Sequence, residues 1–208
     1  MGIWKHRISG AGVILIEKYT MKNNGKQIYC VVLAKNKCSQ EYSDFGGSYE
    51  TKHNDPKNTA KTELLEESRN LLNIHIRHFN NYYDIPAGKY IYRIFLLKIN
   101  NIRRKMYIWN MHAINKHMNI MHRWDETCDI THIPILNMHI DKRAHGKIYT
   151  KDVYGKQICI SGRTSKALRI GYENIIDATT YVPLKKHVSS NKNNKIQFLR
   201  ETLSILVF

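Results

Sequence analysis

The chain has 208 residues, 42% of them hydrophobic, so it is long enough to form one domain with a substantial core. It carries 33 lysines and arginines against 17 acidic residues, and its formal net charge of +16 favours a polyanionic partner such as RNA. Isoleucine, lysine and asparagine are abundant, so the biased composition of an AT-rich genome is an alternative source of the charge. No apolar run reaches the roughly 18 to 20 residues that a membrane span needs, so no membrane partner is expected.

The N-terminal segment and the cysteines both favour a cytoplasmic location. Residues 1–6, MGIWKH, lack the apolar core of a signal peptide. The four cysteines, at positions 30, 38, 128 and 159, form no CxxC pair, as is usual for a protein of a reducing compartment. We therefore expect a cytoplasmic protein with free thiols.

Two strands joined by a hairpin are predicted near the N-terminus. Residues 11–17, AGVILIE, are almost continuously apolar, and residues 28–35, IYCVVLAK, are rich in β-branched side chains, so both are predicted to be buried strands. Residues 19–26 between them contain Asn-Asn-Gly, which is typical of a tight turn. Residues 36–43 are predicted to be a polar loop.

A helix is predicted after a pair of glycines. Gly46 and Gly47 lead into a loop that ends at Asp55 and Pro56. Aspartate is a good N-cap because its carboxylate accepts hydrogen bonds from unpaired backbone amides, and proline suits the first helical position. The helix is predicted over residues 57–70, with Ala60, Leu64 and Leu71 facing the core.

Three glutamates of this helix share one face. Glu63, Glu66 and Glu67 are spaced i, i+3 and i+4, so their carboxylates crowd together and repel one another. A divalent cation would neutralise the cluster, and carboxylate oxygens suit magnesium or manganese. The alternative is an acidic helix face that is simply solvated.

The middle of the chain gives weaker patterns. Residues 74–79 are predicted to be a short strand, and residues 82–88, which contain Pro86, a turn. Residues 89–99, KYIYRIFLLKI, predict a clear strand. Methionines and isoleucines recur at helical spacing within residues 110–122, which predicts a helix there.

The last third of the chain is predicted to add a strand, a hairpin and a helix. Residues 123–136 contain a loop, a short strand and a turn, and residues 146–160 predict a hairpin that turns near Gly155. Residues 161–177 predict one helix, with an apolar stripe formed by Leu168, Tyr172 and Ile175.

The glycines and glutamates together resemble the Nudix box, whose pattern is G-x5-E-x7-R-E-U-x-E-E-x-G-U. Gly47 matches the first glycine, Glu63 the glutamate of the Arg-Glu pair, and Leu64 the apolar position. Glu66 and Glu67 match the Glu-Glu pair. In the Nudix family this loop–helix–loop binds magnesium or manganese and a substrate that contains a diphosphate.

The box departs from the family pattern at several positions. Thr62 replaces the arginine, Arg69 replaces the late glycine, and His53 lies near the position of the seventh-place glutamate. The spacing from Gly47 to Glu63 is also one residue longer than the pattern. In the family, the arginine and the seventh-place glutamate can pair. Their joint loss leaves neither as an unpaired charge. We interpret the box as divergent but functional, because Glu63, Glu66 and Glu67 are all retained.

The resemblance implies a fold, a domain layout and a set of site residues. It implies an α/β fold, the Nudix α/β/α sandwich with a mixed sheet, with residues 1–145 as the hydrolase domain and residues 146–208 as a C-terminal extension packed on the same domain. The implied reaction is metal-dependent hydrolysis of a diphosphate, with Glu67 or Glu126 as the general base and Glu66 as a further catalytic residue. The implied Mg²⁺ or Mn²⁺ ligands are Glu50, Glu63, Glu66, Glu67 and the Gly46 carbonyl.

The composition and the basic charge are similar to those of the mRNA decapping Nudix enzymes of large DNA viruses, the poxviruses and giant viruses. That likeness implies a capped RNA substrate, 7-methyl-GDP and 5′-monophosphate RNA as products, and action in the host cytoplasm. Basic residues interleaved with Tyr107 and Trp109 are candidates for RNA binding, because cations hold phosphates and aromatic rings stack on bases. The alternative is a solvated basic edge. These residues are Lys98, Arg103, Arg104, Lys105 and Lys116.

Two other functions remain open. One is a Nudix hydrolase of small nucleoside or inositol diphosphates, and the other is a catalytically weakened RNA-binding module. Retention of Glu63, Glu66 and Glu67 argues against the second.

Overall fold

A computed structural model describes residues 8–49, 55–68, 71–100, 102, 126–138 and 145–180. The strands are β1 (Ile8–Thr20), β2 (Gln27–Asn36), β3 (Tyr42–Ser43), β4 (Phe45–Ser48), β5 (Tyr82–Ala87), β6 (Tyr90–Ile99), β7 (Thr127–Pro134), β8 (Ile148–Lys151) and β9 (Gln157–Ile160). The helices are α1 (Pro56–Glu67), α3 (Gly162–Ile170) and α4 (Tyr172–Thr180), with short 3-10 turns at η1 (Ile76–His78) and η3 (Ile135–Asn137). No helix in these ranges is long and apolar enough to cross a bilayer.

The long strand β1 is the centre of a mixed sheet. It runs parallel to β6 along most of its length and antiparallel to β2 along its second half, where Leu15 pairs with Val32. Its first half pairs antiparallel with β4, which sets Gly12 opposite Gly46. The strand order is β5-β6-β1-β2-β3-β9-β8, with β7 added beside β2.

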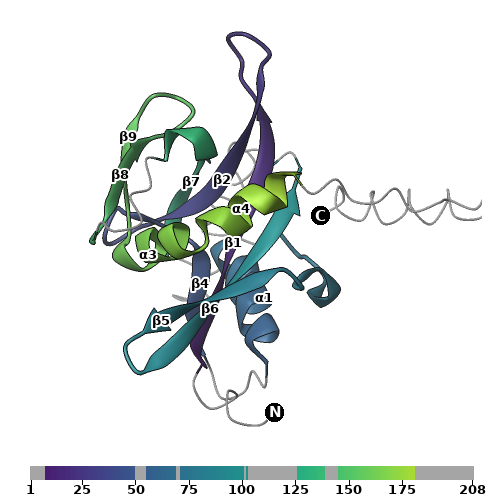
Figure 1. The fold of residues 1–208 in the computed structure, drawn as a ribbon, viewed down its shortest axis with the longest axis vertical. Helices are drawn as coiled ribbons and strands as arrows, with labels where there is room; N and C mark the ends of the chain where they lie inside the picture. The colour runs from purple at the N-terminus through teal and green to yellow at the C-terminus, as the bar shows by residue number, and fades with distance from the viewer. Residues whose placement is uncertain are drawn as a thin grey trace, which may run out of the picture.

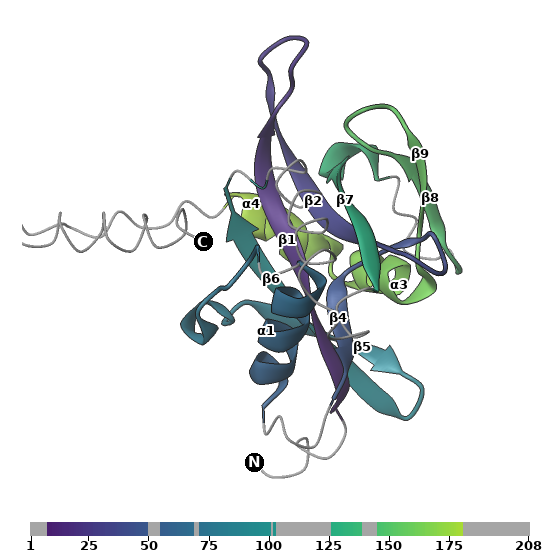
Figure 2. The ribbon, with the colours of Figure 1, turned by 180° about the vertical axis from the view of Figure 1, so that it is seen from behind.

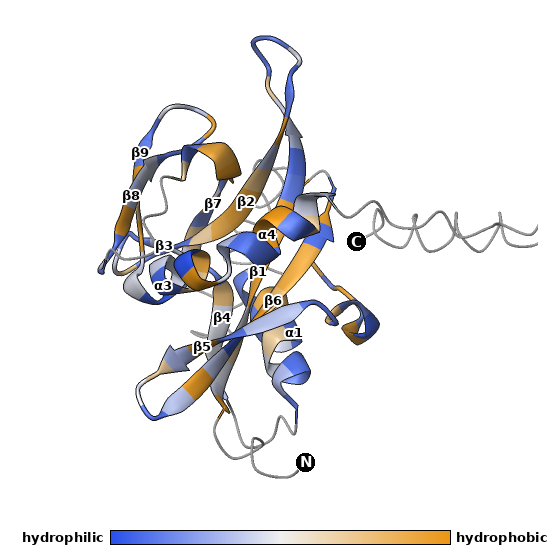
Figure 3. Cartoon of the chain, viewed as in Figure 1, coloured by the Kyte–Doolittle hydropathy of each residue, from blue (hydrophilic) through white to orange (hydrophobic). Residues whose placement is uncertain are grey.

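Helices cover both faces of this sheet, as the α/β/α sandwich predicts. Alternate residues of β1 point to opposite faces. Leu15 packs in one core with Leu64 of α1, whereas Ile14 packs in the other with Leu168 of α3 and Ile175 of α4. Figure 1 shows α4 in front of the sheet, and the reverse view of Figure 2 shows α1 in front of it. The strands between the helices carry much of the apolar colouring in Figure 3.

Helix α1 begins where the sequence predicts. The Asp55 carboxylate accepts a hydrogen bond of 2.9 Å from the Lys57 amide, and Pro56 occupies the first turn. Ala60 and Leu64 are buried, as predicted. The helix ends at Glu67, and Ser68 caps it by donating its amide to the carbonyls of Glu66 and Leu64. The glutamates therefore lie in the last two turns of a firmly started helix.

The predicted strands at residues 11–17, 28–35 and 89–99 are confirmed as β1, β2 and β6. The predicted hairpin at residues 146–160 is confirmed as β8 and β9, which turn at Gly155 with a φ of 80°. The loop, strand and turn predicted at residues 123–136 correspond to β7 and η3 within the part of that range that is described. The predicted helix at residues 110–122 lies outside the described residues.

Two predictions for the middle of the chain are wrong. The strand expected at residues 74–79 is the 3-10 turn η1. The turn expected at residues 82–88 is the strand β5, and the chain reverses at Gly88, whose φ is 62°. Proline is tolerated in β5 because this strand lies at the edge of the sheet, where a missing N–H leaves no partner unpaired.

The single helix predicted at residues 161–177 is two helices, α3 and α4, that meet at Gly171. A Cβ atom at this glycine would lie 2.0 Å from the Tyr83 ring. The Tyr83 hydroxyl donates a 3.0 Å hydrogen bond to the Ala167 carbonyl, near the end of α3. The break therefore lies where the chain passes closest to a buried tyrosine of β5.

Candidate active site

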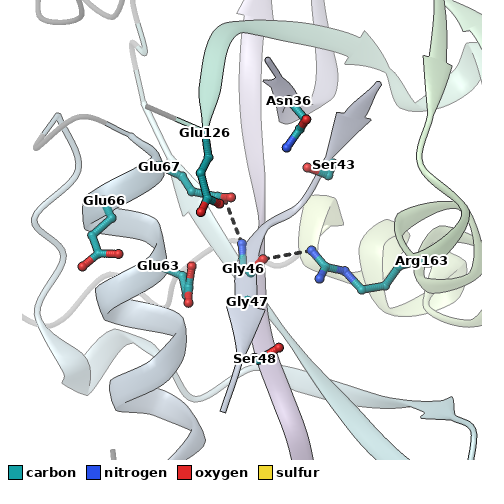
Figure 4. A pocket seen from close by; sticks show the side chains of 10 residues that line it. All are labelled: Asn36, Ser43, Gly46, Gly47, Ser48, Glu63, Glu66, Glu67, Glu126 and Arg163. Atoms are coloured by element: carbon teal, nitrogen blue, oxygen red, sulfur yellow. Dashed lines mark hydrogen bonds between the residues drawn. The ribbon is translucent and has the colours of Figure 1, made fainter. Parts of the chain in front are cut away.

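A polar pocket of about 480 Å³ lies between α1, β4 and α3. Figure 4 shows glutamates of α1 on one side of β4 and an arginine of α3 on the other. The pocket contains most of the acidic residues that the sequence singled out and several residues that it did not. Its lining residues are Asn36, Ser43, Gly46, Gly47, Ser48, Glu63, Glu66, Glu67, Glu126 and Arg163.

The two glycines of β4 let the glutamates reach the strand backbone. The Gly46 amide donates a hydrogen bond of 2.9 Å to Oε2 of Glu67. At Gly47, a Cβ atom would lie 2.3 Å from Oε1 of Glu63, so any larger residue would collide with that carboxylate. A Cβ atom at Gly46 would lie 2.4 Å from the Gly12 backbone on β1. Glycine is therefore required at both positions for different reasons: at Gly46 because β4 lies close to β1, and at Gly47 because the Glu63 carboxylate lies close to the backbone.

The pKa of the Glu67 carboxyl is strongly perturbed. Burial raises its pKa well above 4.5, and the negative charges of Asp44 and Glu63 raise it further. The Arg163 guanidinium and the Gly46 amide oppose this shift without cancelling it. A carboxyl in this position keeps its proton to a higher pH than an exposed glutamate does, and a bound cation would oppose that shift.

The other predicted site residues are placed as follows. Glu126, directly before β7, lines the pocket, and its carbonyl accepts a 2.7 Å hydrogen bond from the Lys37 amide. Glu66 also lines the pocket, although its side chain points away from Gly46 in Figure 4. Lys98 is not among the lining residues, and its ammonium lies 5.3 Å from the centre of the Tyr29 ring. The predicted residues outside the described ranges are Glu50, Arg103, Arg104, Lys105 and Lys116.

The donor atoms of the pocket fit a hard divalent cation. The carboxylates of Glu63, Glu67 and Glu126 and the Gly46 carbonyl offer only oxygen, which magnesium and manganese prefer. The raised pKa of Glu67 indicates a place where positive charge is favoured. Within the described ranges, no three acidic, histidine or cysteine side chains are gathered closely enough to hold one ion as they stand. The donors are thus suitable in kind, and binding an ion would require their carboxylates to move closer together.

Arg163 is the pocket residue that sequence reasoning missed. Its Nη2 donates a 2.9 Å hydrogen bond to the Gly46 carbonyl, and its Nε donates to Oδ1 of Asp44 at 3.2 Å. The guanidinium carbon also lies 4.6 Å from the centre of the Tyr92 ring. Nothing in the local sequence pointed to this arginine, since 117 residues separate it from Gly46.

Asp44 is the anchor of this arginine. It is fully buried, and its carboxylate also accepts hydrogen bonds from the Tyr92 hydroxyl, at 3.1 Å, and from the Thr164 hydroxyl. Burial lowers the pKa of Arg163, but the charge and hydrogen bond of Asp44, together with Tyr92 and Glu67, raise it further than burial lowers it, so the guanidinium stays charged. The C-terminal hairpin and helix therefore bring a fixed positive charge to the acidic pocket.

No protein-family model and no curated protein matches the chain. Among solved structures, a MutT/nudix family protein from Enterococcus faecalis is similar, with a TM-score of 0.52 and 11% identity over 85% of this chain and 64% of that one. A C. elegans Ap4A hydrolase binary complex aligns with a TM-score of 0.38 and 16% identity over 61% of this chain and 80% of that one. The NUDIX domain of Shewanella oneidensis NrtR, complexed with ADP ribose, aligns with a TM-score of 0.43 and 8% identity over 83% of this chain and 90% of that one.

Of these three structures, the Enterococcus protein superposes closely enough to support an argument, and at 11% identity the argument concerns the fold. The chain has the α/β fold of a MutT/nudix protein and spans 64% of the length of that structure. The expectation of a Nudix fold is confirmed. What the pocket does chemically must be inferred from its own residues.

Proposed function

We propose that the chain is a metal-dependent hydrolase of the Nudix type and that the pocket between α1, β4 and α3 is its active site. The observation that carries the proposal is the meeting of Glu63 and Glu67 with the glycine backbone of β4. A helix whose carboxylates lie against the glycine backbone of a strand, in a polar pocket, is suited to hold cations beside a phosphorylated substrate.

The roles follow from the donors. Glu63, Glu66, Glu67, Glu126 and the Gly46 carbonyl would hold Mg²⁺ or Mn²⁺, with Glu50 as a further proposed ligand. Such an ion, when bound, polarises phosphoryl oxygens and lowers the pKa of a bound water. Glu67 or Glu126 accepts a proton from the attacking water. The water oxygen bonds to one phosphorus, the bond from that phosphorus to the bridging oxygen breaks, and the other phosphate leaves.

For the substrate, we propose capped RNA, cleaved at the cap diphosphate to 7-methyl-GDP and 5′-monophosphate RNA in the cytoplasm, as in the decapping enzymes of large DNA viruses. The net charge of +16 supports an RNA substrate, because lysines and arginines gain free energy by releasing the counterions of a phosphate backbone. The second candidate is hydrolysis of a small nucleoside or inositol diphosphate. The polar lining of the pocket supports it, since such a substrate needs little beyond the phosphate site.

The test is a product assay on capped RNA and on small diphosphates, each with magnesium and with manganese. Glu66→Gln and Glu67→Gln should leave the protein folded and lower turnover on the order of 10²- to 10⁴-fold, as loss of a ligand or a general base does. Glu173→Gln is the matched control, because Glu173 is an exposed residue of α4 and does not line the pocket. Near-native rates in both pocket variants would overturn the proposed function.

A further inference from the structure

Arg163 lies between the candidate active-site pocket and a second, adjoining hollow. This smaller hollow of about 250 Å³ shares Asn36, Ser43 and Arg163 with the pocket that holds the glutamates. Its remaining lining comes from Ser39 and Glu41, in the turn that leads to β3, and from Ser161, at the start of α3. A molecule extending from one hollow into the other would have to pass this arginine.

The guanidinium of Arg163 is held firmly and only partly used. Asp44 and the Gly46 carbonyl accept its Nε and Nη2 hydrogens, and the Tyr92 ring covers one face. Its Nη1 donates to none of the described residues, and 39% of the side chain is exposed. Because buried Asp44 is itself fixed by Tyr92 and Thr164, the arginine can offer its remaining hydrogens without first becoming ordered.

The charges across the pocket are arranged for a substrate with more than one phosphate. The carboxylates of α1 and Glu126 repel a polyanion unless cations lie between them. On the α3 side, the positive charge of Arg163 attracts a phosphate without a metal ion, and its planar guanidinium donors match the phosphate oxygens. One phosphate can therefore lie by the glutamates while the next lies at Arg163.

We propose that Arg163 binds the phosphate farther from the glutamates and that the adjoining hollow receives the group attached to that phosphate. The inference rests on the proposed hydrolase function. The hollow is lined by hydroxyl, amide and carboxylate side chains, so it suits a hydroxyl-bearing group such as ribose, held by hydrogen bonds. Asn36 supports this assignment, because the amides of Cys38 and Ser39 donate to its Oδ1 and orient its side-chain nitrogen as a donor.

Binding of ADP and of inorganic pyrophosphate, measured by calorimetry with magnesium present, tests the arginine. Arg163→Gln should weaken both on the order of 10- to 100-fold, as loss of a charged hydrogen-bond donor does. Mn²⁺ affinity measured by paramagnetic resonance should not fall, because the change removes a positive charge beside Glu67 and the Gly46 carbonyl. Arg163→Lys, which keeps the charge and loses the fork, should fall between Arg163→Gln and the parent. Lys166→Gln is the matched control on the same helix, because the Lys166 ammonium donates to the Pro86 carbonyl away from the pocket.

Arg163→Gln leaves the buried Asp44 without its cation, so the fold needs its own control. The double variant Asp44→Asn/Arg163→Gln should recover thermal stability and still bind ADP as weakly as the single variant. Recovery of ADP affinity along with stability would show that Arg163 only supports the fold, and this would overturn the inference.

Ser39→Phe tests the adjoining hollow, because Ser39 is exposed on a turn at its edge and a phenyl ring would fill it. ADP should bind at least about tenfold more weakly, with pyrophosphate binding unchanged. If both affinities fall equally, or if neither falls, the proposed role of the hollow is refuted.

If no diphosphate is hydrolysed but Arg163→Gln still weakens ADP binding, the hydrolase proposal fails and the phosphate site stands. If the parent hydrolyses diphosphates and Arg163→Gln leaves affinity and KM unchanged, or if the parent binds neither probe, the inference fails.

Discussion

The Nη2 of Arg163 donates a 2.9 Å hydrogen bond to the carbonyl of Gly46 and so joins residues 117 positions apart. This bond connects the helix after the C-terminal hairpin to the strand beside the glutamates. The same region is held by the pairing of β9 with β3 and by the hydrogen bond from the Ser161 amide to the Tyr42 carbonyl. Residues beyond position 145 thus complete one wall of the candidate active site.

Gly47→Ala should damage the site more than the fold. The new Cβ would collide with Oε1 of Glu63, the end of a flexible side chain, so Glu63 can move away while β4 stays paired. We expect a loss in metal affinity on the order of 10- to 100-fold, by analogy with disturbed ligand orientation, and little change in the melting temperature. Calorimetric titration with Mn²⁺ and a thermal melt measure the two effects.

The neighbouring glycine gives the contrasting control for that variant. Gly46→Ala would press a Cβ atom against the Gly12 backbone, which cannot turn away, so the fold itself should be destabilised. Gly162→Ala should be silent, because a Cβ atom there meets nothing within 4 Å. An equal drop in melting temperature for Gly47→Ala and Gly46→Ala would contradict the expected division between site and fold.

Glu67→Gln should stabilise the metal-free protein at neutral pH. The pKa of Glu67 is raised in the folded state, so the folded protein holds this proton more tightly than the unfolded chain does. The folded state therefore loses stability as pH rises above the unfolded value of 4.5 and goes on losing it until the folded pKa is passed. Glutamine does not titrate and still accepts the Gly46 hydrogen bond.

Thermal melts in a chelator from pH 4 to pH 8, read as differences from the parent, check the Glu67 prediction. The melting temperature of Glu67→Gln minus that of the parent should increase as pH rises. The same difference for Glu173→Gln, at an exposed position, should not change with pH. Added Mn²⁺ should raise the melting temperature of the parent by more than that of Glu67→Gln, because a ligand of the folded state stabilises it by mass action. A pH-independent difference would mean that Glu67 is not perturbed as described.

Gly171→Ala should destabilise the protein by overpacking. The Cβ atom would lie 2.0 Å from the buried ring of Tyr83, which is held by its hydrogen bond to the Ala167 carbonyl. Forcing extra atoms into a packed core costs about 1–3 kcal/mol in the free energy of unfolding. Urea denaturation measures this cost, with Gly162→Ala as the open-space control. A parent-like midpoint would show that α3 and α4 do not need a glycine between them.

The sequence predicted the elements that carry their own signal. β1, β2 and β6 have long apolar runs, and α1 has a local cap at Asp55. The strands β3 and β4 have 2 and 4 residues and include two glycines, so they show no periodicity and exist through pairing with β1, β2 and β9. Arg163 could not be found for the same reason, because its contact with Gly46 is created by the tertiary fold.

The glutamates of the candidate site could be named from the sequence because i, i+3 and i+4 spacing fixes them on one helix face. Asp44 could not, because its importance comes from complete burial beside Tyr92 and Thr164, which are 48 and 120 residues away. A lone aspartate before a glycine pair has no distinguishing pattern. Local geometry thus predicted the acidic half of the pocket, and long-range packing determined the basic half.

Replacing Arg103, Arg104 and Lys105 together with alanine tests whether the charge of the chain serves RNA binding. These residues lie outside the described ranges, so the test rests on the sequence alone. Each phosphate contact to single-stranded RNA adds about 0.7 to the log-log slope of affinity against salt, so loss of all three should flatten the slope by roughly 2. Affinity for RNA should fall whatever its sequence, whereas hydrolysis of a short cap analogue should change little.

The matched control for this triple variant replaces Lys18, Lys22 and Lys26 with alanine and so removes the same charge elsewhere. These lysines lie on the β1–β2 hairpin, whose tip is drawn far from α1 in Figure 1. If the lysines and arginines of the chain only reflect biased composition, the two triple variants should lose RNA affinity equally. If residues 103–105 contact the RNA backbone, only the first variant should show a flatter dependence of RNA affinity on salt. A parallel loss of cap-analogue and long-RNA hydrolysis in the first variant would mean that the segment supports the fold or the active site, and the RNA-binding prediction would then be wrong.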